Sequence, residues 1–426
     1  MAGLERTLIA ASVVALVGCG VLEIDPISSG GASGVGGAPG PEPFDRPAVS
    51  SSSGDGSAAG GRGPFTCETD VATAPYVRPL DVVFVVDNAP SMVDAIAAFE
   101  TQLYPRFAYV LQVLGADAQV IVVSDHGEGP REVCIGPPLA EPASSCAGAP
   151  GSVPGQFLHY SVTIGGGDGL CRLLDTYRGR EDGGTTDDFA VEDDGWQTWM
   201  RPEAFRALVM LSDGRPACTW RGERFDDADD PTLVPSSSAA ALVALNFDRA
   251  LRQRDPARFG TLNRRNYAFY SLLGVAAPAP SAPLGHAPAA PLVTTSCPGA
   301  ATSGYGYQWL SRATGGARYA ASCASADMGA ILSDVASSMV VDAIDRCALV
   351  IDDPETAPAD VVSVKSYGPE GERETFPRVN GRSACGISGG MYVDGDTVRL
   401  CPESCGAVRL DPAVDLRLFT ACPRVE

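Results

Sequence analysis

Two aspartates each follow a run of apolar residues and open a short polar loop. Residues 81–92 read DVVFVVDNAPSM, so the apolar run Val82–Val86 leads directly into Asp87, and Ser91 follows four residues later. The segment LVMLSDG likewise leads from apolar residues into Asp213. Carboxylate and hydroxyl oxygens are hard ligands, which suit Mg²⁺ or Mn²⁺. The pattern therefore allows a divalent-metal site whose ligands include Asp87, Ser91 and Asp213.

The loop after Asp87 also has a purely structural interpretation. A serine side chain can cap the N-terminus of a helix, and Ser91 stands where a helix is expected to begin. Asp87 and Ser91 would then belong to a hydrogen-bonded turn between a strand and a helix. The residues themselves leave both interpretations open.

Strands alternate with helices between residues 81 and 341. Apolar runs predict buried strands at Asp81–Val86, Ala118–Ser124 and Ala204–Ser212, and the alternating run Phe157–Ile164 predicts a strand exposed on one face. Further strands are expected at Asn266–Val275 and Ala317–Ala321. Apolar residues at helical spacing predict helices at Ser91–Leu114, Gly169–Arg178, Ser238–Arg254, Tyr307–Thr314 and Met328–Val341. This alternation predicts an α/β fold whose mostly parallel sheet is covered on both faces. Parallel strands end at a common edge, which would bring Asp87 and Asp213 together.

The pattern of apolar and polar residues changes over residues 347–426. Short alternating runs are separated by Gly, Pro and Asp, and Asp394-Gly395 is typical of a hairpin turn. The segment holds Cys385, Cys401, Cys405 and Cys422, with Cys347 at its edge. These features predict a small cysteine-rich antiparallel β region in which crosslinks compensate for a thin core.

The order of these motifs resembles a von Willebrand factor type A (VWA) domain. Asp87–Met92 is similar to that family's Asp-x-Ser-x-Ser-Met pattern, LVMLSDG to its later strand ending in Asp-Gly, and Tyr307–Ala321 to its closing helix, Gly-Gly and strand. The resemblance covers about residues 78–342 and assigns residues 67–346 to such a domain. It implies a doubly wound, Rossmann-like sheet. It also implies a site that binds Mg²⁺ or Mn²⁺, where an acidic side chain of a partner completes the coordination of the ion.

This sequence departs from the family's pattern at two positions. Ala89 replaces the first serine, and the loop Gly165–Asp168 contains no threonine where the family has one. The best alternative threonine is Thr186, in the segment Gly183–Thr186. The metal site is therefore expected to be degenerate and to bind Mg²⁺ or Mn²⁺ weakly.

The first 18 residues are typical of a lipoprotein signal peptide. The apolar run Leu8–Val17 is shorter than the roughly 20 residues that a membrane-spanning helix needs. It ends in Leu16-Val17-Gly18-Cys19, which resembles a bacterial lipobox and implies cleavage before Cys19 and lipidation of its thiol. The absence of aspartate after Cys19 favours the outer membrane or the cell surface.

The segment from residue 19 to residue 66 is rich in Gly, Ser, Ala and Pro, which is typical of a flexible tether. Once Cys19 is set aside, the 13 cysteines of the chain leave an even number, so that up to six disulfides are expected after export. The net charge of −21 argues against a nucleic-acid partner.

These features together predict an exported, lipid-anchored binding or adhesion protein that recognises a protein or a cell-surface ligand. No Gly-x-Ser-x-Gly, P-loop or zinc-protease motif appears in the sequence, so no enzymatic activity is expected. Two alternatives remain: a metal-free structural lipoprotein of the cell envelope and a metal-dependent hydrolase.

Overall fold

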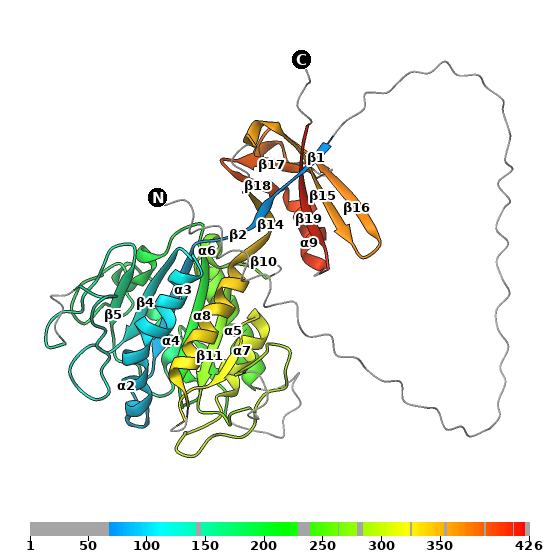
Figure 1. The fold of residues 1–426 in the computed structure, drawn as a ribbon. Coiled ribbons are helices and arrows are strands. Elements are labelled where there is room, and N and C mark those ends of the chain that lie inside the picture. Colours follow the sequence, from blue (N-terminus) through cyan, green and yellow to red (C-terminus); the bar gives the residue numbers. More distant parts are fainter. Residues whose placement is uncertain are drawn as a thin grey trace, which may run out of the picture. The chain divides into compact units, whose positions relative to one another are not determined.

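The computed structural model describes residues 68–141, 146–228, 239–262, 264–278, 284–323, 326–352, 356–386, 389–411 and 413–421. The expected signal peptide, Cys19 and the tether lie outside these residues. The chain divides into two compact units (Figure 1). One spans Pro75–Val350, and the other combines Ile351–Glu426 with the segment that ends at Ala74.

A seven-stranded sheet forms the centre of the Pro75–Val350 unit. Its order is β12-β13-β11-β6-β3-β4-β5, and every neighbouring pair is parallel except β12 and β13. The chain enters the sheet in the middle at β3, runs outward to β5, returns to β6 beside β3 and then runs to the other edge. The strands are β3 (Leu80–Val86), β4 (Ala118–Ser124), β5 (Phe157–Ser161), β6 (Phe205–Ser212), β11 (Tyr267–Leu273), β12 (Gly285–His286) and β13 (Arg318–Ala320).

Helices cover both faces of this sheet, as the sequence predicts (Figure 1). Alternate side chains of β3 enter two separate cores: Val82 and Phe84 pack with the helices of one face, and Val83 and Val85 with those of the other. The first face carries α2 (Val93–Gln102), the π-helical turn η2 (Leu103–Ala108), α3 (Tyr109–Val113) and α8 (Met328–Ala343). The second carries α4 (Gly169–Asp175), α5 (Ala239–Arg254), α6 (Pro256–Phe259) and α7 (Tyr305–Thr314). The prediction of a mostly parallel, covered sheet is confirmed.

Short elements complete this unit. They are the 3-10 turns η1 (Pro90–Met92), η3 (Gly179–Asp182) and η4 (Trp196–Trp199), the hairpin of β7 (Ala217–Trp220) with β8 (Glu223–Asp226), and the pair of β9 (Gly260–Thr261) with β10 (Arg264–Arg265). Within the described parts of the chain, no helix combines the length and the apolar character that crossing a bilayer requires.

Strand β5 is buried on both faces, although the sequence predicts one exposed face. The segment that follows α4 covers this edge of the sheet. The Tyr160 hydroxyl donates to the carbonyl of Thr185 at 3.1 Å, and the Ser161 N–H donates to Oδ2 of Asp187 at 2.7 Å. The side of β5 that is expected to face water is therefore covered by a loop, which accepts hydrogen bonds from the Tyr160 hydroxyl and the Ser161 N–H.

Two small sheets are built from the remaining strands. The first, antiparallel at each of its pairings, has the order β1-β19-β15-β16, and the second has the order β17-β18-β14-β2. The first contains β1 (Glu68–Val71), β15 (Val361–Gly368), β16 (Gly371–Pro377) and β19 (Asp415–Ala421). The second contains β2 (Thr73–Val77), β14 (Ile344–Ile351), β17 (Met391–Asp394) and β18 (Thr397–Leu400). Further short elements are α9 (Pro402–Leu410), η5 (Pro358–Asp360) and η6 (Arg382–Ala384).

The cysteine-rich region differs from its prediction in two ways. Strand β1 pairs with β19 and so joins the C-terminal strands, although the expected boundary assigns it to the preceding domain. The segment that follows Cys401 forms the helix α9, with Pro402 at its first position, where a missing N–H costs nothing. The predicted hairpin turn is present, because Gly395 lies between β17 and β18 with a φ of +64°.

All ten cysteines within the described residues are disulfide-bonded, which confirms the predicted pairing for this part of the chain. Cys19, Cys67 and Cys422 lie outside it. The disulfides among the described cysteines include Cys134–Cys146, Cys171–Cys218, Cys297–Cys323 and Cys385–Cys401.

Candidate functional site

Asp87 and Asp213 follow the carboxyl ends of the neighbouring strands β3 and β6. These strands pair in parallel, and the Asp87 N–H donates to the carbonyl of Leu211 at 3.0 Å. The connection from β3 leads toward one edge of the sheet, and the connection from β6 leads toward the other. In open α/β sheets, the crevice at such a reversal is the usual place for a bound ligand. The structure therefore brings both predicted carboxylates to the position where a site is expected.

The Asp87 carboxylate is buried and organises the loop around it. Its Oδ1 accepts a hydrogen bond from the Ala89 N–H at 2.8 Å, and its Oδ2 accepts one from the Ser212 hydroxyl at 2.7 Å. The Ser212 Oγ in turn accepts from the Gly214 N–H at 3.0 Å. Ser212 thus links the loop after β3 to the loop after β6. Its place directly before Asp213 is the only sequence signal for this role.

Burial is the largest influence on Asp87 and raises the pKa of its carboxyl to about 6. Hydrogen bonds from Ser212 and Ala89 oppose this shift of the pKa, whereas the negative charges of Asp213 and Asp168 add to it. Asp213 is also buried, and its Oδ2 has no hydrogen-bond partner among the described residues. Two buried carboxylates therefore lie close enough for the charge of one to act on the other.

Arg215 is the basic residue nearest to this pair in the sequence, but its guanidinium is engaged elsewhere. It pairs with Asp226 at 2.7 Å and lies 3.8 Å from the carboxylate of Asp227. Within the ranges that the structure describes, neither Asp87 nor Asp213 forms an ion pair. A buried negative charge is costly without a partner, so a cation beside these two carboxylates would offset that cost.

The loop Gly165–Asp168 lies against these two loops. A Cβ atom on Gly166 would lie 3.6 Å from the Cβ of Ala89 and 3.9 Å from Oδ2 of Asp87, and one on Gly214 would lie only 2.1 Å from the Gly166 carbonyl oxygen. Gly214 therefore cannot carry a side chain, which explains the Asp-Gly pair at the end of β6. The charge of Asp168 reaches Asp87, although Asp168 also pairs with Arg172 at 3.0 Å.

Thr186 lies in a different part of the unit. The residues on either side of it, Thr185 and Asp187, contact Tyr160 and Ser161 of β5, and β5 is separated from β3 by β4. The suggestion that Thr186 supplies the third loop is therefore corrected: Gly165–Asp168 is the third loop beside Asp87. Sequence spacing misled here because the loop that covers β5 is a separate insertion after α4.

Ser91 lies in the turn η1, and its side chain is exposed. The cap position of η1 is Ala89 and that of α2 is Met92, and neither helix start has a side-chain cap. The expected role of Ser91 as an N-cap is therefore wrong, because Pro90 begins the helical turn one residue earlier. Asp87, through the Ala89 N–H, closes the turn instead.

Asn88 holds together the loops that follow β3, β4 and β5. Its Oδ1 accepts from the N–H groups of Ile164 at 2.9 Å and Asp125 at 3.2 Å. Its Nδ2 donates to Oγ of Ser124 at 2.9 Å and to the carbonyl of Arg131 at 2.6 Å. Sequence reasoning missed this residue, because an asparagine after a strand is typical of any turn. Its four hydrogen bonds fix the position of the adjacent Asp87.

Two buried histidines lie at the same end of β4 and β5. Their Nδ1 atoms are 3.3 Å apart, and Nε2 of His159 is 3.1 Å from the carbonyl oxygen of Ser124. Because that carbonyl only accepts, Nε2 of His159 carries the proton, and His126 donates from Nδ1. Burial lowers the pKa of His159 to about 3, so His159 is neutral at physiological pH. The pair supports the loops behind Asn88.

Asp87 and Asp213 offer carboxylate oxygens, the donors that a hard divalent cation prefers. The neighbouring loops add the hydroxyl of the exposed Ser91 and the carboxylate of Asp168, whose oxygens already accept from the Gly165 N–H and from Arg172. Among the described residues, no group of three or more His, Cys, Asp or Glu side chains is placed to hold a metal ion. Within the described part of the chain the buried Oδ2 of Asp213 has no hydrogen-bond partner, and a bound cation would account for this. Because Ala89 offers no hydroxyl, the site has one ligand fewer than the resemblance implies.

Comparisons with known proteins assign no family to the chain. No family model matches it, and no curated protein matches it.

Proposed function

We propose that the Pro75–Val350 unit is a VWA-like, doubly wound binding domain whose carboxyl-edge crevice holds a divalent cation. The order of its strands supports this proposal. When the six parallel strands are numbered along the chain, their order across the sheet is 3-2-1-4-5-6, which is that of doubly wound nucleotide-binding folds. Asp87 and Asp213 follow strands 1 and 4, which flank the reversal.

In this proposal Asp87 and Asp213 bind Mg²⁺ or Mn²⁺, and Ser91 and Asp168 lie beside them. The single observation that carries the proposal is the buried Oδ2 of Asp213, which has no hydrogen-bond partner among the described residues and belongs to a carboxylate whose charge raises the pKa of Asp87. A bound cation would supply an open coordination position for an acidic group of a protein or cell-surface ligand. Mg²⁺ commonly keeps water at such positions, so the lost hydroxyl of Ala89 weakens the site without abolishing it.

The proposed setting is the surface of a bacterial cell. Cys19 would carry the lipid anchor at the outer membrane, and the tether over residues 19–66 would hold the domain away from the lipid. The disulfides of the described residues agree with an oxidising compartment. With a net charge of −21, the chain is unsuited to nucleic acid. Binding, without catalysis, is the proposed activity.

One observation favours the alternative of a metal-free structural lipoprotein. Both oxygens of Asp87 already accept hydrogen bonds, from Ala89 and from Ser212, so the turn is closed by the protein itself. The two functions differ in what happens when a cation is added. A purely structural turn would not bind Mg²⁺, whereas the proposed site binds it.

Calorimetric titration with MgCl₂ and MnCl₂ tests the proposal. We expect the purified chain to bind one ion with a dissociation constant in the millimolar range. Asp213→Asn should abolish binding, and the matched control Asp360→Asn, at an exposed position of the other unit, should leave it unchanged. Binding that survives Asp213→Asn, or no binding by the unmodified chain, would contradict the proposal.

A further inference from the structure

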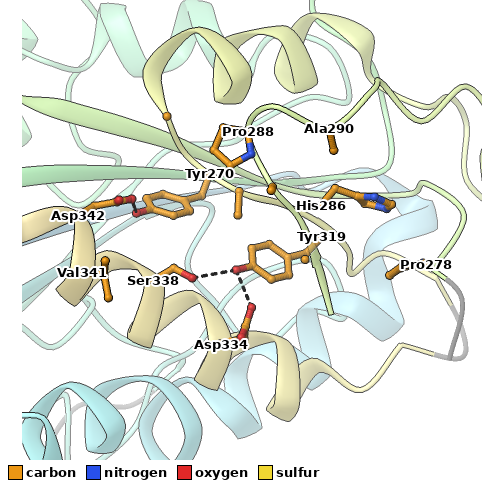
Figure 2. A pocket seen from close by; sticks show the side chains of 14 residues that line it. Tyr270, Pro278, His286, Pro288, Ala290, Tyr319, Asp334, Ser338, Val341 and Asp342 are labelled. Atoms are coloured by element: carbon orange, nitrogen blue, oxygen red, sulfur yellow. Dashed lines mark hydrogen bonds between the residues drawn. The ribbon is translucent and has the colours of Figure 1, made fainter. Parts of the chain in front are cut away.

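A cavity lies beside strand β13, and neither Asp87 nor Asp213 lines it. Its volume is about 570 Å³, within the range of small-molecule pockets. Its walls come from β11, β13, α8 and the segment around β12 (Figure 2). The lining includes Ala317, which precedes β13, and Gly315, which follows α7. The cavity is therefore distinct from the crevice at the carboxyl ends of the strands.

Two carboxylates of α8 face this cavity, and each is held by a tyrosine hydroxyl. The Tyr270 hydroxyl donates to Oδ2 of Asp342. The Tyr319 hydroxyl donates to Oδ2 of Asp334 at 2.9 Å and lies 3.4 Å from Oγ of Ser338 (Figure 2). A tyrosine hydroxyl is neutral at physiological pH, so these contacts orient the carboxylates without compensating their charge.

The described lining of the cavity contains no lysine or arginine. The nearby guanidinium of Arg318 is directed at backbone oxygens and donates to the carbonyls of Ala287 and Ala290 at 3.0 and 2.8 Å. Burial and the charge of Arg318 lower the pKa of His286, which keeps this imidazole neutral at physiological pH. The cavity therefore carries negative charge that its own walls leave uncompensated.

The remaining walls are apolar or aromatic. They include Pro288, Ala290 and Val341, together with the rings of Tyr270 and Tyr319 (Figure 2). Aliphatic chains gain from burial against such surfaces, and tyrosine rings also attract cations to their faces. These walls fit a ligand that combines positive charge with a hydrocarbon body, whereas a bare ion would leave most of the cavity unused.

The spacing of the carboxylates defines the ligand further. Asp334, Ser338 and Asp342 recur at intervals of four residues, so they line one side of α8. Asp334 and Asp342 are eight residues apart, which corresponds to about 12 Å along the helix axis. One metal ion cannot bridge that distance, but two ammonium groups joined by a hydrocarbon chain can.

We propose that this cavity binds a linear aliphatic diamine or polyamine. One ammonium group pairs with the partly buried Asp342, the other pairs with Asp334 at the exposed rim, and the chain between them crosses the rings of Tyr270 and Tyr319. Each ammonium group donates charge-assisted hydrogen bonds to a carboxylate oxygen that the tyrosine hydroxyl leaves available. This site does not depend on the cation proposed at Asp87.

Titration calorimetry with two diamines of equal charge tests the proposal. In 150 mM NaCl, a concentration chosen to screen surface charge, we expect 1,8-diaminooctane to bind the full chain about tenfold more tightly than 1,4-diaminobutane, because only the longer chain reaches both carboxylates. Asp342→Asn should weaken binding of the longer diamine by about tenfold, the loss expected for a charge-assisted hydrogen bond. The variant keeps an oxygen that can accept from Tyr270.

Asp334→Asn, at the exposed rim, is a second variant in case Asp342→Asn fails to fold, and it should also weaken binding. Asp360→Asn removes the same charge at an exposed position of the other unit and serves as the control. Equal affinity for both diamines would overturn the proposal. It would also be overturned if Asp334→Asn and Asp360→Asn weakened binding equally, since the diamine would then be responding only to the net charge of −21.

Discussion

Asp87 combines structural and electrostatic roles at a single position. Its two carboxylate oxygens close the turn after β3 and tie it to Ser212 of β6. At the same time its burial, and the charge of Asp213, raise the pKa of the carboxyl to about 6. A residue needed only for a turn could be an exposed asparagine or serine. A buried aspartate beside a second buried aspartate is more costly, and a cation would offset that cost.

Ser212 provides a test at the scale of one hydroxyl. We expect Ser212→Ala to lower the free energy of unfolding by about 1–3 kcal/mol, because Asp87 and the Gly214 N–H each lose a buried partner. Urea denaturation measures this change. Ser337→Ala, at an exposed position of α8, is the control and should change the free energy by less than about 0.5 kcal/mol. Equal effects of the two variants would contradict the linking role of Ser212.

The sequence predicts the carboxylates of this site better than its supporting residues. Asp87 and Asp213 stand out because each ends a buried apolar run, and parallel strands end at a common edge. Asn88 and Ser212 have no such signal, since their roles depend on which loops become neighbours in space. The motif Gly183–Thr186 suggests Thr186 as a ligand, but the fold of the insertion after α4 decides the position of this residue.

The predicted helix Ser91–Leu114 shows a similar limit at the scale of elements. The structure divides it into η1, α2, the π-helical turn η2 and α3. Pro105 lies inside η2, and proline has no N–H to donate to the preceding turn. The apolar spacing predicts the buried face correctly, with Ile96, Phe99 and Phe107 in the core, but it does not reveal the local change of helix type.

The buried pair of Asp81 and Arg201 connects β3 to the segment before β6. The Asp81 carboxylate is fully buried and accepts from Nε of Arg201 at 2.9 Å and from its backbone N–H at 2.7 Å. We expect Arg201→Met to lower the free energy of unfolding by about 3–5 kcal/mol, because a buried charge would be left unpaired. Urea denaturation measures the loss.

Two comparisons make this prediction specific. Arg180→Met disrupts an exposed pair with Asp193 and should cost less than about 1 kcal/mol. Adding Asp81→Asn to Arg201→Met removes the unpaired charge and should restore part of the lost stability. If the double variant is no more stable than Arg201→Met alone, packing of the arginine side chain explains the loss instead of charge.

The buried histidine of β5 predicts a pH dependence. In the folded chain the pKa of His159 lies near 3, well below the usual value of about 6.5 in an unfolded chain. Between these values the unfolded chain binds the extra proton, so the stabilising contribution of His159 is present above pH 6.5 and is lost as the pH falls. The loss is about 1.4 kcal/mol for each pH unit.

The variant His159→Gln isolates this effect, since the pKa of Asp87, raised to about 6, acts in the opposite direction between pH 6 and pH 4. Urea denaturation from pH 7 to pH 4 should show the unmodified chain losing stability relative to the variant as the pH falls. A constant difference between the two proteins across this range would show that His159 is not buried in its neutral form.

At the scale of the whole molecule, the sequence predicts the composition of the units better than their boundaries. The alternation of strands and helices identifies the large sheet, and the even cysteine count anticipates the disulfides. It does not show that β1 pairs with β19, because the two strands are separated by almost the entire chain and four-residue strands carry little pattern. Pairings of such long range are decided by tertiary packing.

The proposed anchor is tested by cell fractionation. We expect Cys19→Ser to move the protein from the membrane fraction to the soluble fraction, because the thiol that would carry the lipid is lost. The unmodified chain is expected in the membrane fraction. Membrane association that is unchanged in the variant would exclude Cys19 as the anchor and would leave the lipobox resemblance without a function.

The central claim is that a divalent cation binds between Asp87 and Asp213. Its affinity for the site is expected to be low because Ala89 offers no hydroxyl ligand. The most direct measurement is the melting temperature of the purified chain with and without 10 mM MgCl₂, a concentration at which a loosely held millimolar site fills. The account predicts a small rise for the unmodified chain, a larger rise for Ala89→Ser, which supplies the absent hydroxyl, and no rise for Asp213→Asn. A folded Ala89→Ser variant whose melting temperature does not respond to Mg²⁺ would contradict it, because restoring the missing ligand must strengthen a real site.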